Sequence, residues 1–383
     1  MEMQLTRKAE NHRTQGWYLN NGEIEMFLTE EGGLHAPVTF FANSGSPVQP
    51  YFLAPWLDDR PDLTGMSPLQ DLRGDFFCLP FGGNGAPVNG IQAPCHGETC
   101  LNPWTLLSAQ QDANLAVFEF AEEGKVLPMH VVKRIEMRAG HSVLYLRHPV
   151  TGLDAVAPYG HHTILEMPSA NEKMYFSCGK FDLGMTPTGL FSNPVNQEYQ
   201  YLAVGATFDS LEAVPTMFQS PATHDYTVYP SPVGYTDMIQ LMKRPTETPA
   251  WSAAAYVDRG YLFYTLKDAA VLPATTLWIA NSGRYGFPWN GRTSCFSIEE
   301  TCGYFADGWK ASSEENLLSK QGWKTAGVFR KDVPFVVSEI QGVVRLPAGF
   351  GKVADAQFAP GKVTFVDATG KRATAEVDWS FVK

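Results

Sequence analysis

The sequence has few of the residues that build a disulfide framework, a nucleic-acid interface or a membrane span. Six cysteines are spread through 383 residues, too sparsely for the cross-links of small secreted domains. Lys and Arg number 29 against 40 Asp and Glu, giving a net charge of −11 without a basic stripe. This balance argues against a nucleic-acid partner. No run reaches the ~18 apolar residues of a membrane helix, so we expect no membrane partner.

Targeting and metal-binding motifs are also missing. Residues 1–17 are polar, with no apolar run behind the basic side chains, so we expect a cytoplasmic protein with reduced thiols. Cys95 and Cys100 are close together, but no second CxxC or HxxxH half accompanies them. We therefore expect no metal site.

Helix signals are scarce. The clearest lies in residues 312–322, where Ser312 and Glu315 have capping-box spacing and Gly322 suits the position after a helix. We expect one short helix there. No repeat of roughly 20–50 residues and no low-complexity linker divides the chain. A single domain over residues 1–383 is therefore predicted.

Turn-forming and aromatic residues are abundant instead. The chain has 34 Gly, 27 Pro and 13% aromatics, and 44% hydrophobic residues allow a sizeable core. Between the turns, runs of about 5–9 residues alternate polar and apolar side chains, as strands do. Segments made of one or more such runs lie at residues 23–33, 115–123, 131–137, 142–149, 260–266, 275–281, 293–300 and 361–379. The pattern predicts an all-β fold, a large antiparallel β-sandwich of two stacked sheets with few short helices.

Two segments place a polar reactive side chain beside aromatics and glycines in the first third of the chain. Arg73 opens "RGDFFCLPFGG", although pairing with Asp71 or Asp75 at a strand edge would explain it equally. His96 opens "HGETCLNPW", which ends at Trp104, although a loop histidine bonded to backbone would look the same. Each segment alone is a weak indication of a site.

Two further segments lie later in the chain. His161 and His162 are adjacent, so on a strand one would face the interior or a pocket and the other the opposite side. Glu299 and Glu300 end an apolar strand, and one of them must point inward, where a carboxylate needs a partner. A solvent-exposed strand end is the plain alternative for the glutamates.

The order Arg, His, His, Glu along an all-β chain resembles the galactose mutarotase-like (aldose 1-epimerase) superfamily, and most closely its glucose-6-phosphate 1-epimerase branch. "RGDFFCLPFGG" is similar to the branch's RGG-P-aromatic-G segment, with Arg73 at the substrate-binding arginine. "HGETCLNPW" resembles its HGF…W segment, with His96 at the histidine. "GHHT" resembles G-x-H-P, with His162 at the histidine, and "FSIEE" resembles the x-E-P strand end, with Glu299 at the catalytic glutamate.

The resemblance covers residues 17–325 and implies the supersandwich fold and an isomerase that interconverts the α and β anomers of a hexose or hexose phosphate. In that reading Glu299 is the base on the C1 hydroxyl, and His162 is the acid on the ring oxygen. His96 orients or shares that oxygen, and Arg73 donates to sugar hydroxyls. The chemistry needs no metal or redox cofactor.

Four more residues are substrate-binding candidates. Trp104 and Trp278 could stack on the apolar face of a sugar, although both could be plain core. Arg292 could meet a phosphate, although an exposed turn arginine needs no ligand. His161 is expected on the face opposite His162, and a bulge there would exchange their roles.

The chain departs from the family pattern at several positions. Thr163 and Glu300 replace two prolines, and Asp75-Phe76 replaces Gly-Ile. Residues 326–383 extend past the usual end and are predicted to be additional strands capping the sandwich. An alternative function is therefore a carbohydrate-binding or regulatory protein that keeps the pocket without turnover. A third is a polysaccharide-modifying enzyme on a similar sandwich.

Overall fold

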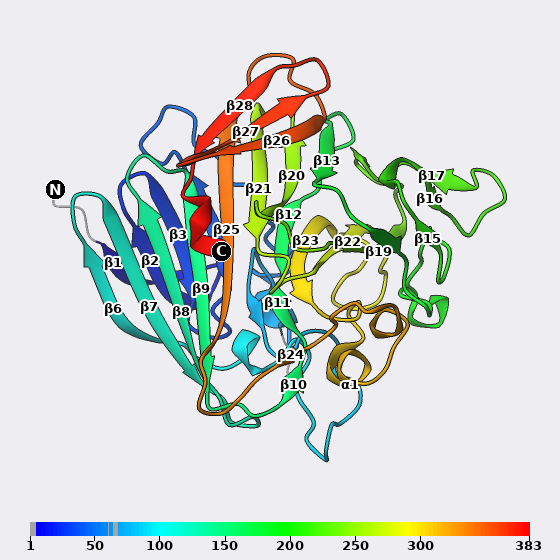
Figure 1. The fold of residues 1–383 in the computed structure, drawn as a ribbon, viewed down its shortest axis with the longest axis horizontal. Helices are drawn as coiled ribbons and strands as arrows, with labels where there is room; N and C mark the ends of the chain where they lie inside the picture. Colours follow the sequence, from blue (N-terminus) through cyan, green and yellow to red (C-terminus); the bar gives the residue numbers. More distant parts are fainter. Residues whose placement is uncertain (1–4, 60, 64–67) are drawn as a thin grey trace.

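The computed structural model describes residues 5–59, 61–63 and 68–383, and it consists mainly of antiparallel strands (Figure 1). A nine-stranded sheet forms one layer of the sandwich. In spatial order its strands are β18 (Val228–Tyr229), β13 (Met174–Cys178), β20 (Ala250–Tyr256), β21 (Tyr261–Lys267), β25 (Phe335–Arg345), β9 (Val143–Thr151), β8 (His130–Arg138), β7 (Leu115–Glu123) and β6 (Thr105–Gln111).

An eight-stranded sheet forms the facing layer and carries the residues of interest. Its strands are β15 (Thr207–Phe208), β14 (Leu183–Met185), β19 (Tyr235–Met242), β22 (Ala274–Asn281), β23 (Ser294–Cys302), β11 (Tyr159–His161) and β5 (Phe77–Cys78), with β12 (Thr163–Glu166) paired to β23 beside β11. Phe176 of β13 and Phe296 of β23 meet at 5.3 Å between ring centroids, so the two sheets share one apolar core. This arrangement confirms the predicted all-β sandwich.

Smaller sheets surround this sandwich. A four-stranded sheet contains β1 (Thr6–Asn11), β2 (Thr14–Asn20), β3 (Ile24–Thr29) and β4 (His35–Phe40). Two-stranded pairs join β10 (Val156–Ala157) to β24 (Gly327–Val328) and β16 (Val214–Pro215) to β17 (Thr223–His224). The predicted strand segments coincide with observed strands because alternation marks the half-buried ones well; β7 alternates buried and partly exposed residues over most of its length.

The carboxyl-terminal residues divide between two layers. β25 lies inside the nine-stranded sheet between β21 and β9, so the sandwich itself extends beyond residue 325, where the resemblance was predicted to end. The remaining strands, β26 (Val353–Ala359), β27 (Lys362–Asp367) and β28 (Arg372–Glu376), form a three-stranded sheet. Figure 1 shows it at the top of the view, and Phe365 packs on Trp251 and Tyr264, which lie on the outer face of the nine-stranded sheet.

The predicted helix over residues 312–322 is wrong in position. The one α-helix in the described residues, α1 (Gly308–Ser313), ends where that segment begins. Ser312 accepts a hydrogen bond from Tyr304 N instead of capping a helix, and Asn316 accepts from two later backbone amides and so turns the chain. Short 3₁₀ turns make up the other helical residues: Leu69–Asp71, Glu98–Cys100, Pro194–Asn196, Leu211–Ala213, Ser319–Gln321 and Trp379–Val382.

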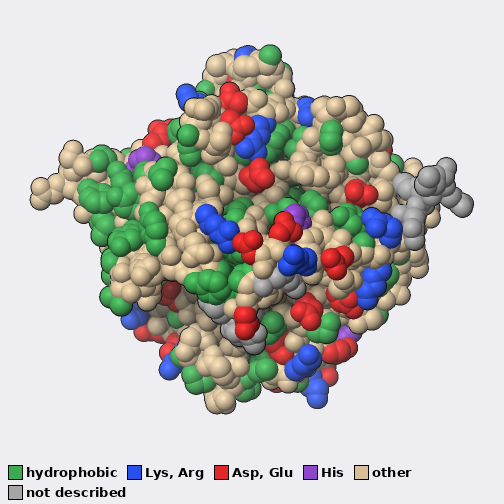
Figure 2. Space-filling view, turned by 180° about the vertical axis from the view of Figure 1, so that it is seen from behind, with side chains coloured by type: hydrophobic (Ala, Val, Ile, Leu, Met, Phe, Trp, Pro, Cys, Tyr) green, Lys and Arg blue, Asp and Glu red, His purple; other side chains and the backbone are tan. Residues whose placement is uncertain are grey.

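The surface shows no large area of one charge on the face seen in Figure 2, where acidic and basic side chains are mixed. Hydrophobic side chains gather there on the lobe that carries β16 and β17, and the loop between these strands exposes Met217 and Phe218. Within the described ranges, every helix is too short or too polar to span a bilayer.

Candidate active site

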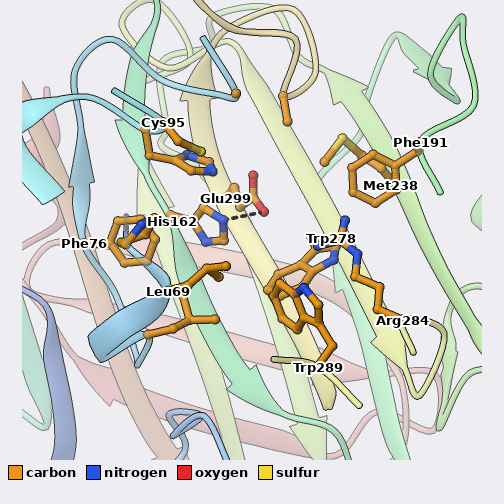
Figure 3. A pocket seen from close by; sticks show the side chains of 15 residues that line it. Leu69, Phe76, Cys95, His162, Phe191, Met238, Trp278, Arg284, Trp289 and Glu299 are labelled. Atoms are coloured by element: carbon orange, nitrogen blue, oxygen red, sulfur yellow. Dashed lines mark ion pairs between the residues drawn. The ribbon is translucent and has the colours of Figure 1, made fainter. Parts of the chain in front are cut away.

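A cavity of about 440 Å³ lies against the face of the eight-stranded sheet that is turned away from the sandwich core. Its volume is in the range of small-molecule sites. The sheet contributes Met238, Trp278 and Glu299 from three neighbouring strands, and a loop contributes His162 (Figure 3). His96 lines the cavity from another loop. Four residues singled out from the sequence therefore share one cavity.

Glu299 reaches the cavity because β23 alternates its side chains between two buried environments. Ile298 enters the core between the sheets, whereas Glu299 points to the opposite side and stays 1% exposed. The strand is covered on both faces, so nearly every residue of β23 is buried. Neither carboxylate oxygen of Glu299 has a hydrogen-bond partner among the described residues. An unpartnered buried carboxylate is costly and is typical of a functional site.

His162 lies between β11 and β12 and faces Glu299. Its Nε2 is 3.4 Å from Glu299 Oε1. Phe76 stacks on the imidazole at 4.7 Å between ring centroids and fixes its plane. The Ser297 hydroxyl donates to the Thr163 carbonyl at 2.8 Å, so toward His162 Nδ1, at 3.5 Å, it can only accept. This favours the Nδ1–H tautomer of His162, with the lone pair of Nε2 directed to Glu299.

His96 approaches the same pair from a tight turn. Its φ of +57° lies in the left-handed region, which non-glycine residues seldom adopt. The next residue, Gly97, has a φ of +85°, and a Cβ there would lie 2.0 Å from the Leu79 carbonyl oxygen. Glycine is therefore required for the turn that presents His96. The His96 ring meets the His162 ring edge-to-face at 4.9 Å.

Burial keeps these three side chains uncharged at neutral pH. It raises the pKa of Glu299 to about 8, and the nearby Ser297 hydroxyl offsets part of that effect. It lowers the pKa of His96 to about 4 and holds the pKa of His162 well below its usual range. Glu299 and His162 together therefore hold one exchangeable proton over a wide pH range. A pair that shares one proton can donate at one atom while it accepts at another.

The other end of the cavity is aromatic and contains an arginine. Trp278 lies 5.9 Å from the His162 ring, and Trp289 packs against Trp278. Arg284 lines the cavity beside these indoles, and Phe191 lies on its other side (Figure 3). Sequence reasoning missed Arg284 and selected Arg292 from the same loop. The signal that could have found it is the aromatic and glycine content of "GRYGFPWNG".

Comparison with solved structures identifies the architecture, whereas no protein-family model and no curated protein matches the chain. A galactose mutarotase-like protein from Clostridium acetobutylicum superposes with a TM-score of 0.59 at 11% identity, covering 89% of this chain and 98% of its own. A candidate mutarotase from Salmonella typhimurium gives 0.57 at 11% identity, covering 90% and 95%. The chain has the galactose mutarotase-like fold. A candidate aldose 1-epimerase from Klebsiella pneumoniae agrees, with 0.58 at 12% identity over 88% and 81%.

Arg73 does not line the cavity of this mutarotase-like fold. Its side chain is fully buried, and its guanidinium donates to Thr14 Oγ1 at 2.8 Å and to Asn11 Oδ1 at 3.0 Å. It also donates to the carbonyls of Asp71 and Ala36. Arg73 thus ties the amino-terminal sheet to the loop before β5, and its donors are occupied by protein atoms. Its predicted contact with sugar hydroxyls has no basis in this geometry.

The other three predicted binding residues also lie elsewhere in the mutarotase-like fold. His161 is fully buried on the interior side, with its Nδ1 2.9 Å from Asp75 Oδ2. Trp104 is a core residue whose Nε1 donates to the Thr99 carbonyl. Arg292 is exposed and pairs with Asp59 at 3.0 Å, outside the cavity lining. In the described part of the chain, no group of three or more His, Cys, Asp or Glu side chains is arranged to hold a metal ion.

Proposed function

We propose that this protein is an isomerase of the aldose 1-epimerase type, which interconverts the anomers of a hexose or a hexose derivative. The observation that supports this most directly is the 3.4 Å contact between His162 Nε2 and Glu299 Oε1 at the wall of a cavity. The mutarotase-like fold and the edge-to-face contact of His96 with His162 add to it. A carboxyl group and an imidazole are suited to moving protons to and from sugar oxygens.

The reaction opens and recloses a hemiacetal ring. The Glu299 carboxylate takes the proton of the C1 hydroxyl, the bond between C1 and the ring oxygen breaks, and protonated His162 supplies a proton to that oxygen. The open aldehyde rotates about its C1–C2 bond, and the reverse transfers close the ring on the other face. Protons balance in each half of the cycle. At opening Glu299 takes one proton while His162 gives one, and at closure both transfers are reversed.

The resting pair already contains the proton that this cycle needs. Protonated Glu299 with neutral His162 differs from carboxylate with imidazolium only by the transfer of one proton between two atoms 3.4 Å apart. Substrate hydroxyls that donate to the carboxylate would favour the charged form, since neither Glu299 carboxyl oxygen accepts a hydrogen bond in the described structure. His96 would help to hold the ring oxygen, and Trp278 would support the apolar sugar face.

Anomer exchange measured at equilibrium by magnetization-transfer NMR tests the proposal. The panel contains glucose, galactose, glucose 6-phosphate and two hexuronates, each with and without protein. We expect accelerated exchange for at least one sugar, and a loss of about 10²- to 10⁴-fold in kcat for Glu299→Gln, the range for removing an acid–base group. Sugar binding by calorimetry without any acceleration would refute the enzyme proposal and indicate a binding protein.

The adjacent residues His161 and His162 provide an internal control. His162→Asn should reduce kcat about 100-fold or more, because it removes the acid. His161→Asn should act through stability, since His161 contacts Asp75 in the interior and not the cavity. Comparing kcat for protein that remains folded by circular dichroism separates the two effects. A larger fall in kcat for His161→Asn would refute the assigned roles.

A further inference from the structure

Arg284 has donors that no described residue accepts. Its guanidinium carries five N–H groups, yet none makes a hydrogen bond to the described protein, and the buried Nε is among them. Nε forms an ion pair with Glu198 Oε1 at 3.4 Å, which leaves the two Nη groups without a described partner atom. The side chain is only 18% exposed and lines the cavity. A nearly buried guanidinium with unused donors on a cavity wall indicates a ligand.

Three aromatic rings hold this guanidinium in place. The Arg284 Cζ atom lies 5.0 Å from the Trp289 ring centroid, 5.3 Å from that of Phe191 and 5.6 Å from that of Trp278. Such contacts stabilise a desolvated cation without using its N–H groups. Trp278 Nε1 is also buried and has no partner in the described structure. Two neighbouring residues therefore offer hydrogen-bond donors and no acceptor.

A carboxylate is the complement of this arrangement. Its two oxygens accept bidentate bonds from the planar guanidinium and can also accept from an indole N–H. A phosphate dianion would gain more from a second cation, and the described cavity-lining residues include no lysine and no other arginine. Glu299 and the two cavity histidines do not repel an anion, because burial keeps Glu299 protonated and both histidines neutral near pH 7. Glu198 pairs with Arg284 Nε but does not line the cavity.

The position of Arg284 relates this anion site to the proposed chemistry. Trp278 lies between the two, 5.9 Å from the His162 ring and 5.6 Å from the guanidinium carbon. Figure 3 shows Arg284 on the far side of Trp278 from Glu299. A pyranose lying along Trp278 would present its anomeric carbon to Glu299 and a substituent at the other end of the molecule to Arg284.

We propose that the preferred substrate is a hexuronate whose carboxylate is bound by the Arg284 guanidinium and the Trp278 indole N–H. This inference rests on the proposed function and specifies its substrate class. Arg284 is a substrate-binding residue in this arrangement, and it acts on affinity and not on the proton transfers.

Substrate preference measured by NMR anomer exchange tests the inference. Glucuronate and galacturonate are compared with glucose, galactose and glucose 6-phosphate at equal ionic strength. We expect kcat/KM for a uronate to exceed that for the matching neutral hexose about 10- to 100-fold, as for a hydrogen-bonded charged group. Equal or higher values for the neutral hexoses, or a preference for the phosphate ester, would overturn the inference while leaving the proposed function intact.

Arginine variants test the residue itself. Arg284→Gln should lower kcat/KM for the uronate about 10- to 100-fold, mainly through KM, and lower it for the neutral hexose by a clearly smaller factor. Arg284→Lys keeps a cation but loses the planar fork, so it should lower kcat/KM for the uronate by about 10-fold. This conservative variant also controls for a folding defect in Arg284→Gln. Arg330→Gln removes an exposed arginine outside the cavity lining and is the control.

The outcomes separate the two proposals. An equal loss for uronate and neutral hexose in both Arg284 variants would mean a structural role and would overturn the inference. If no sugar exchanges faster with protein, the proposed function fails. Calorimetry then still decides on the anion site: uronate binding that disappears in Arg284→Gln supports it, and binding that persists refutes it.

Discussion

At the scale of single residues, Glu299 occupies an environment that costs folding free energy. Its carboxyl group is 1% exposed and lacks a hydrogen-bond partner in the described structure, and the ring of His162 and the hydroxyl of Ser297 are its polar neighbours. Burial therefore favours the neutral acid and raises the pKa to about 8. The same environment makes the group able to exchange a proton near neutral pH, which an exposed glutamate does less well.

The pH dependence of catalysis follows from this pKa. In the proposed mechanism, activity requires one proton on the Glu299–His162 pair, and that proton is lost as the pH rises through about 8. We expect kcat/KM to be level at neutral pH and to fall about tenfold per pH unit well above 8. A fall on the acid side should begin only well below 6.5, because burial lowers the pKa of His162. A profile that rises steadily from pH 7 to 10 would contradict the shared-proton state.

The same pKa predicts how the Glu299→Gln variant changes stability. Folding raises the pKa of Glu299 from 4.5 to about 8. The protonated Glu299 therefore contributes stability that is fully present below pH 4.5 and is lost as the pH rises to 8. The variant does not lose this stability. Its free energy of unfolding, relative to that of the wild type, should therefore rise by roughly 4 kcal/mol at most across that pH range. Urea unfolding of both proteins at pH 5 and pH 8.5 measures the gain. An equal difference in unfolding free energy at the two pH values would show that Glu299 is not buried as the acid.

At the scale of elements, β23 carries adjacent carboxylates into two different environments. Glu299 faces the cavity, whereas Glu300 faces the sandwich interior and contacts Lys267 of β21, so it joins the two sheets. Glu300 also accepts hydrogen bonds from three hydroxyls, those of Ser252, Thr265 and Thr275. This network holds the backbone of β23 where the adjacent Glu299 must be placed.

Removing one partner of the Lys267–Glu300 pair should be more harmful than removing both charges. Lys267→Met leaves a fully buried carboxylate without its cation and should destabilise the fold by about 3–5 kcal/mol. The double variant Lys267→Met with Glu300→Gln removes both charges and keeps atoms that can bond the hydroxyls. It should therefore recover part of that loss. Unfolding free energies from a double-mutant cycle check this; strictly additive losses would mean that the pair is not coupled.

The sequence predicts the strands whose side chains alternate regularly, and it does not predict the elements and side-chain positions that depend on tertiary contacts. Half-buried strands such as β7 alternate clearly, and their positions follow from the pattern. The helix over residues 312–322 was misplaced because Ser312 bonds to Tyr304 and Asn316 bonds to Thr325, both beyond the four-residue span of the capping rules. Arg284 was missed because a loop has no period, and Arg73 was overvalued because its partners Asn11 and Thr14 are remote in sequence.

Two departures from the sequence pattern that the chain resembles are explained only by the three-dimensional structure. Asp75 and Thr163 stand where the family has glycine and proline, and in the structure the Thr163 hydroxyl donates to Asp75 Oδ1 at 2.9 Å. His161 contacts the other oxygen of the same carboxylate, and Gln341 of β25 donates to Thr163. These substitutions form one buried polar cluster behind His162. They therefore do not by themselves argue for a lost activity.

At the scale of the whole molecule, the carboxyl-terminal residues belong to the structure in two different ways. β25 pairs with β21 on one side and β9 on the other, so it completes the nine-stranded sheet and brings Glu339 and Gln341 to the polar cluster behind His162. The later three-stranded sheet covers the outer face of the same sheet, where Val363 and Phe365 are fully buried. β25 is therefore part of the sandwich, and the three-stranded sheet covers it.

Two truncations should therefore differ sharply. Ending the chain after Arg345 keeps β25 but exposes the apolar face that Val363 and Phe365 cover, a loss of roughly 3–6 kcal/mol for these two side chains alone. This fragment should still fold, with a lower unfolding midpoint and increased binding of an apolar dye. Ending the chain after residue 325 removes β25 and leaves β21 and β9 without their shared partner in the middle of a sheet. That fragment should not fold cooperatively; a two-state urea transition for residues 1–325 would show that the sandwich closes without β25.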